Sequence, residues 1–187
     1  QARNLDPPRR LLAVQSSTDV LNEQLRRGDF FLCASEKQRD FWLGQLAAVG
    51  RINPATYDRG ENLEGLLAVA PFGVTDEPPR HTRPVLRGVV PGIGEDDKVV
   101  LWGGGIYNWF DPLTLLRAVD KLRRRLPEVR LYFLGLKHPN PQVGEMKMAD
   151  DAVALGEELG LVGTNVFFNA DWVEYGDRQN YLLEADI

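Results

Sequence analysis

Three consecutive glycines, Gly103 to Gly105, follow a short apolar run and precede an Asp-Pro pair at Asp111. Glycine lets the backbone come close to a ligand. Asp is a favoured N-cap and Pro suits the first helical position, so the pair predicts a helix that starts at Asp111. A helix start presents free N–H groups and partial positive charge. The stretch predicts a strand, a glycine-rich loop and a helix N-terminus, a combination that favours an anion such as phosphate. The alternative is a tight turn.

Two more specific glycine motifs are absent from this stretch. No G-K-[ST] occurs, so a P-loop would lack the lysine and hydroxyl that its chemistry needs. No G-x-G-x-x-G occurs either, and Leu136-Lys137 follows Gly135 where an NAD site would have an acid after the second strand. A classical dinucleotide-binding fold is therefore disfavoured.

The elements that must position the glycine loop alternate regularly in the second half of the chain. Apolar runs predict strands at 98–102, 129–134 and 166–168, and amphipathic or capped segments predict helices at 111–126, 146–159 and 177–184. This alternation is typical of a Rossmann-like α/β fold, with a parallel sheet and helical crossovers. The loops after the strands are 103–110, 135–145 and 169–176, and in a parallel sheet they gather at the carboxyl edge, where ligands bind. We expect a site there; the alternative is three decorated surface loops.

The first half of the chain also mixes helices and strands. It predicts a helix at 18–27 closed by Gly28, strands at 29–34 and 66–70, and a helix capped by Ser35. Residues 71–84 contain four prolines, which predict a stiff connector between domains. The alternative is a rigid loop inside one domain. We therefore predict one domain in residues 1–70, a Pro-rich linker at 71–84 and a second domain in residues 85–187.

Composition excludes several classes of protein. The chain has 187 residues, of which 43% are hydrophobic and 26% charged, as in ordinary globular proteins. Its formal net charge of -5 argues against nucleic acid as a partner. The apolar run from Leu66 to Phe72 is too short to span a bilayer. The single cysteine, Cys33, lies in an apolar run and predicts a core thiol, which fits a reducing, cytoplasmic setting.

Four stretches together resemble the GT-B fold glycosyltransferases, the nucleotide-sugar-dependent class that includes bacterial polysaccharide-building enzymes. They are residues 29–39 (DFFLCASEKQR), 69–74 (VAPFGV), 102–111 (WGGGIYNWFD) and 166–186 (VFFNADWVEYGDRQNYLLEAD). The first is similar to the end of the acceptor domain in that class, and the second to the segment between its domains. The other two resemble the first glycine loop and a later segment of the donor domain.

The resemblance implies a two-lobed GT-B-like architecture, of which this chain is a truncated fragment: the end of the acceptor-side domain and the first half of the nucleotide-sugar-binding domain. It implies transfer of a sugar from a nucleotide diphosphate sugar to a glycan or lipid-linked acceptor, in polysaccharide or cell-envelope biosynthesis, with no other cofactor and no metal. The implied donor-binding residues are Gly103, Gly104, Gly105, Ile106, Asp111, Lys137, Trp172 and Val173, with the base held by the loop that contains Trp172.

The fragment interpretation carries further expectations. The acidic E-x7-E segment of the class would fall beyond Ile187, so no catalytic residue is assigned and the fragment by itself is expected to be inactive. An unpaired strand edge and an uncovered apolar helix face would also favour self-association.

This chain departs from the pattern of the class in one respect. Members commonly carry Arg and Lys after the glycine loop to hold the diphosphate, whereas Tyr107, Asn108 and Trp109 stand here. Lys137 could supply the charge from the next loop; the alternative is a solvated surface lysine.

The remaining clusters give weaker signals. His81 and His138 have no ligand-like spacing with acids, which argues against a metal site. Arg123 to Arg125 close a helix, where cations oppose the dipole, although peripheral contact with anionic lipid at the inner face of the membrane stays open.

Two other functions stay open. One is a different nucleotide-binding α/β enzyme, such as a sugar-nucleotide epimerase. The other is a non-enzymatic flavodoxin-like binding module. A phosphoacceptor version of that module would need an acid after its first strands, where Trp102 and Gly103 stand.

Overall fold

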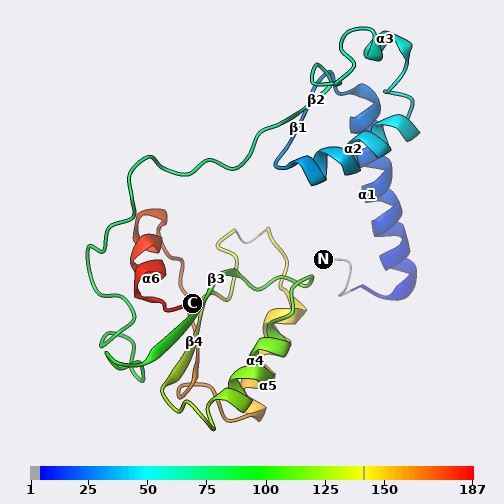
Figure 1. Cartoon of the computed structure of the whole chain (residues 1–187). Helices are drawn as coiled ribbons and strands as arrows, with labels where there is room; N and C mark the ends of the chain where they lie inside the picture. Colours follow the sequence, from blue (N-terminus) through cyan, green and yellow to red (C-terminus); the bar gives the residue numbers. More distant parts are fainter. Residues whose placement is uncertain (1–4, 141) are drawn as a thin grey trace. The chain divides into compact units, whose positions relative to one another are not determined.

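The computed structural model describes residues 5–140 and 142–187 of the chain (Figure 1). These residues form two compact units, residues 5–76 and residues 77–187. Each unit contains one parallel sheet, so the chain is a mixed α/β protein with parallel strands, as the sequence predicts. Among the described residues, no helix is both long and apolar enough to cross a membrane.

The first unit is built from three helices and two strands. They are α1 (Pro7–Arg27), β1 (Phe31–Cys33), α2 (Glu36–Ala48), α3 (Pro54–Tyr57) and β2 (Leu67–Val69). β1 and β2 pair in parallel, with Phe31 opposite Leu67. The Cys33 side chain is buried together with Leu25, Leu46 and Leu67, which confirms that it is a core thiol.

The helix predicted from Thr18 begins earlier, at Pro7. The Asp6 side chain caps it by accepting a hydrogen bond from the Arg9 N–H at 3.0 Å, and Pro7 occupies the first helical position, where no N–H is needed. Thr18 lies within the helix, and its hydroxyl donates to the carbonyl of Val14. The local sequence at Asp6-Pro7 already carries this start signal.

The second unit alternates strands and helices, as the sequence predicts. Its elements are β3 (Lys98–Gly105), α4 (Pro112–Leu122), β4 (Val129–Gly135), α5 (Lys147–Glu158), β5 (Val166–Phe168), a short 3-10 helix (Tyr175–Asp177) and α6 (Arg178–Glu184). The strands lie in the order β3-β4-β5, and both pairs are parallel.

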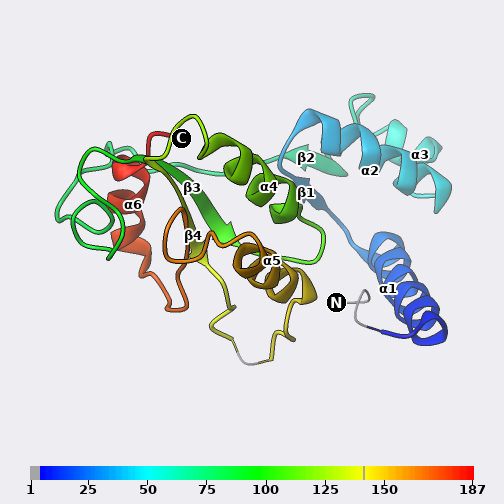
Figure 2. The ribbon, with the colours of Figure 1, turned by 90° about the horizontal axis from the view of Figure 1, so that it is seen from below.

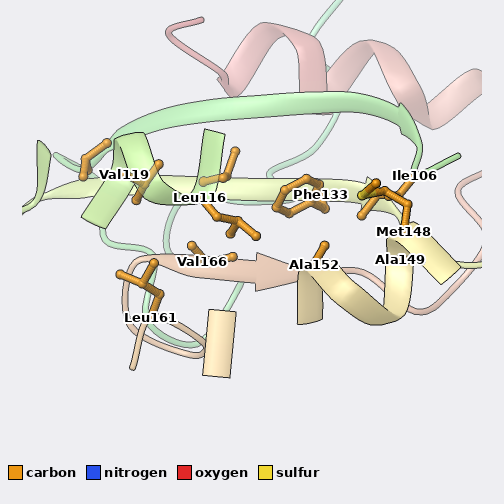
Figure 3. Packing of buried hydrophobic residues seen from close by; sticks show 11 residues of the cluster. Ile106, Leu116, Val119, Phe133, Met148, Ala149, Ala152, Leu161 and Val166 are labelled. Carbon is orange, nitrogen blue, oxygen red and sulfur yellow. The ribbon is translucent and has the colours of Figure 1, made fainter. Parts of the chain in front are cut away.

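Helices cover both faces of this sheet. α4 and α5 lie on one side of β3 and β4, and α6 lies on the other (Figures 1 and 2). Successive side chains of β4 point to opposite faces, because the side-chain period of a strand is two. Phe133 therefore joins the core with α4 and α5, shown in Figure 3, while Tyr132 and Leu134 join a second core that Tyr181 of α6 covers.

Residues 186 and 187 lie beside β3, at the edge that does not pair with β4. The chain passes from β3 to β4 and β5, and then returns through α6 to the other edge of β3. There the backbone of Ile187 donates to the carbonyl of Val99 at 3.3 Å and accepts from the N–H of Leu101 at 2.8 Å, the hydrogen-bond pattern of parallel strands. Open α/β sheets bind their ligands outside the carboxyl ends of the strands.

The second half of the predicted linker is fastened to α6. The backbone N–H of Thr82 donates to the Asn180 side chain at 2.8 Å, and Arg83 pairs with Asp177 at 2.6 Å. Because Asp177 and Asn180 belong to the second unit, these bonds make residues 80–84 part of that unit as well.

Candidate ligand-binding pocket

A pocket of about 620 Å³ lies at the carboxyl edge of the three-stranded sheet. All three loops that follow the strands contribute to it, which confirms the expectation that they gather there. Of the predicted donor-binding residues, seven line the pocket: Gly103, Gly104, Gly105, Ile106, Lys137, Trp172 and Val173. The predicted site residues therefore come together from three separate parts of the sequence.

The three glycines lie in the last part of β3, not in a loop as the sequence predicts. The ladder with β4 shifts register after Trp102 and resumes where Gly105 pairs with Gly135. The prediction is wrong here because Gly105 pairs with Gly135 of a distant strand, so β3 continues through Gly103 and Gly104 despite the weak preference of glycine for strands.

The backbone fold does not itself require glycine at Gly103 and Gly104. Among the described residues, positive φ angles at glycine occur elsewhere and not at these two. A Cβ atom added at Gly103 or Gly104 would meet no other atom within 4 Å. Glycine inside a strand costs stability because it loses more conformational entropy on folding. Open space in front of a bare backbone is what a ligand that packs against this strand would need.

Gly105 is different from its two neighbours. A Cβ atom there would approach the ring of Tyr107 to 3.1 Å, so this glycine makes room for the protein's own side chain. The Trp102 indole N–H donates to the carbonyl of Gly105 at 3.3 Å, which further defines the end of β3.

Two of the charged side chains that line the pocket are basic. Lys137 comes from the loop after β4, and Arg178 is the first residue of α6. Asp171 is the one carboxylate among the described lining residues. The basic groups make the pocket suitable for an anionic ligand.

Side-chain hydrogen bonds hold the loops in place around the pocket. Asn169, directly after β5, donates to the carbonyl of Leu134 at 3.0 Å and accepts from the N–H of Asp171 at 3.3 Å. Asn108 is buried, and its side-chain oxygen accepts from the N–H of Met148 at 3.0 Å, which ties the loop after β3 to the first turn of α5. The pocket is thus bounded by loops that are bonded to neighbouring elements.

Two predicted site residues have structural roles in addition to, or instead of, lining the pocket. The Ile106 side chain is 1% exposed and packs in the core with Phe133. Asp111 is not among the lining residues. Its carboxylate caps α4 by accepting from the N–H of Thr114 at 3.1 Å and from its hydroxyl at 2.7 Å. The Thr114 hydroxyl and N–H lower the pKa of Asp111, since they stabilise the ionised form.

Sequence reasoning missed several lining residues. Tyr107 and Phe110 bring aromatic rings to the pocket, and Arg178 brings a guanidinium. A signal for Arg178 was available, because it lies at the start of the helix after β5 and therefore at the same edge of the sheet as the loops. Among the described residues, no group of three or more His, Cys, Asp or Glu side chains could hold a metal ion.

Comparison with known protein families, curated proteins and solved structures finds no match to this chain.

Proposed function

We propose that the second unit binds the nucleoside diphosphate sugar of a GT-B-type glycosyltransferase, and that the two parallel-sheet units correspond to its two Rossmann-like lobes. The reaction would transfer the sugar to a glycan or lipid-linked acceptor in the cytoplasm. The supporting observation is the pocket at the carboxyl edge of the sheet, where Gly103 and Gly104 leave open backbone between loops that carry Lys137 and Trp172.

Each part of the pocket matches one part of such a donor. Exposed backbone in Gly103 and Gly104 allows the close approach of a diphosphate. Basic side chains offset its charge, and the developing charge of the leaving diphosphate would be stabilised by such fixed positive groups during sugar transfer. The aromatic ring of Trp172 offers a flat surface at the side of the pocket, suited to a base.

The experiment that tests this function replaces Gly104 by Val and measures nucleotide binding by calorimetry. A Cβ atom at Gly104 meets no neighbour, so valine should leave the fold intact and fill the space in front of the strand. We expect wild type to bind UDP, GDP or ADP and their sugar conjugates. Gly104→Val should weaken that binding at least about tenfold, which corresponds to about 1.4 kcal/mol.

Gly144→Val is the matched control. A Cβ atom at Gly144 also meets nothing within 4 Å, and this glycine is not among the residues that line the pocket. Its variant should bind like wild type. If Gly104→Val keeps its fold and binds nucleotide as tightly as wild type, the proposed role of the glycines in phosphate binding is wrong. Binding of NAD+ in place of nucleoside diphosphates would favour the epimerase alternative.

A further inference from the structure

Arg178 is held over two aromatic rings at the edge of the pocket. Its guanidinium carbon lies 5.1 Å from the centre of the Trp172 ring and 5.6 Å from that of Tyr175. The Arg178 residue is half-buried and lines the pocket. A cation within about 6 Å of a ring centre is attracted by the ring quadrupole. The position of this charge is therefore defined by neighbouring rings.

In the described part of the chain, no carboxylate is paired with the Arg178 side chain. The adjacent residue, Asp177, is already paired with Arg83 at 2.6 Å. Within residues 5–140 and 142–187, no carboxylate oxygen lies within 4.0 Å of an Arg178 nitrogen. This differs from Arg87, which lies near the same helix and pairs with Asp186 at 2.6 Å.

An arginine held in this way keeps its hydrogen-bonding capacity. The attraction to the rings acts through the π-system and uses none of the five N–H donors. The planar guanidinium can then form two parallel hydrogen bonds with one phosphate group, which a lysine cannot do. Arg178 has the properties of a phosphate-binding residue whose partner comes from solution.

We infer that Arg178 binds the diphosphate of the nucleotide sugar, with Lys137 contributing a second positive charge from the neighbouring loop. This inference rests on the proposed function. It identifies a phosphate-binding cation that comes from the start of α6, since Tyr107, Asn108 and Trp109 provide none after the glycines. Arg178 would then recognise the diphosphate of the ligand and not its base.

The test compares diphosphates with the corresponding nucleosides in calorimetry: UDP with uridine, GDP with guanosine and ADP with adenosine. Arg178→Gln should weaken binding of the preferred diphosphate at least about tenfold, about 1.4 kcal/mol. It should leave the affinity for the nucleoside unchanged. Arg178→Lys, which keeps the charge and loses the planar fork, should fall between wild type and Arg178→Gln.

Arg117→Gln is the control for net charge. Arg117 lies on α4 and is exposed, and it is not among the residues lining the pocket. Its variant should bind diphosphates like wild type. Thermal unfolding of all variants checks that each one is folded.

The outcomes separate the inference from the proposed function. Failure of wild type to bind any of the three diphosphates would overturn the proposed function. If wild type binds and Arg178→Gln binds equally well, the inference fails and the proposed function stands. If Arg178→Gln weakens the binding of nucleoside and diphosphate equally, Arg178 only stabilises the loop that contains Trp172, and the inference is overturned as well.

Discussion

Glu184 on α6 is a buried carboxylate that fastens a distant segment of the chain. It accepts hydrogen bonds from the backbone N–H groups of Val85, Leu86 and Arg87, at 2.8, 2.7 and 2.9 Å. The His81 ring nitrogen lies 2.7 Å from the same carboxylate. Burial opposes ionisation of Glu184, but the hydrogen bonds from His81 and the three N–H groups outweigh it and lower its pKa below the ordinary 4.5.

Replacing Glu184 by Gln should destabilise the second unit by about 1–3 kcal/mol. An amide group cannot accept from all these donors, so at least one buried N–H would lose its hydrogen bond. The lowered pKa adds a pH dependence. The stabilisation from Glu184 is fully present above pH 4.5 and is lost as the pH falls through its lower folded pKa. Urea unfolding at pH 7 and at pH 3 should therefore show a larger difference in stability for wild type than for Glu184→Gln.

Glu158→Gln makes the same chemical change on an exposed residue of α5. It should change neither the stability at pH 7 nor the difference in stability between pH 7 and pH 3. A Glu184→Gln variant as stable as wild type at pH 7 would show that the carboxylate does not hold residues 85–87.

At the scale of elements, β4 is the central support of the pocket. Of its seven residues, Val129 and the four from Leu131 to Leu134 are buried, because helices cover both faces of the sheet. Phe133 is 0% exposed and stacks on Phe168 of β5, with ring centres 4.8 Å apart. It also lies 5.6 Å from the ring of Trp102 in β3, so it joins all three strands.

Phe133→Ala should lower the free energy of unfolding of the second unit by about 3–5 kcal/mol, because it removes a buried ring and leaves a cavity between the strands. Urea unfolding followed by tryptophan fluorescence measures this, since Trp102 lies beside the cavity. Phe72→Ala is the control: Phe72 is 90% exposed, so its loss should change stability by less than about 0.5 kcal/mol. A small effect of Phe133→Ala would mean that the core closes around the missing ring.

At the scale of the whole molecule, the chain consists of two compact units that meet in sequence between Asp76 and Glu77. Phe72 and Val74 lie just before this boundary, 90% and 93% exposed. Beyond it, residues 80–83 and 85–87 are bonded to the 3-10 helix and α6. Exposed backbone without such bonds is where proteases cut first.

Brief thermolysin digestion should therefore cleave first before Phe72 or Val74, and mass spectrometry should find a resistant fragment that ends at Ile187. Glu184→Gln should make residues 85–87 a second early site, since it weakens the bonds that protect them. First cleavage within residues 85–87 of wild type would contradict the bonding of this segment to α6.

The sequence by itself determines most of the elements of the second unit. The strands predicted at 129–134 and 166–168 and the helix start predicted at Asp111 lie close to their observed bounds. They follow from apolar runs, caps and glycines within a few residues of one another. The same local signals place the loops at one edge of a parallel sheet, and seven of the eight predicted site residues do line one pocket.

Only the tertiary structure decides how the glycines, Arg178 and Glu184 are used. The glycines are extended because Gly105 pairs with Gly135, thirty residues away. Arg178 lines the pocket with its guanidinium over the rings of Trp172 and Tyr175. Glu184 accepts hydrogen bonds from N–H groups of residues about one hundred positions earlier. Local propensity is set by near neighbours, whereas these roles depend on contacts that exist only once distant segments have packed together.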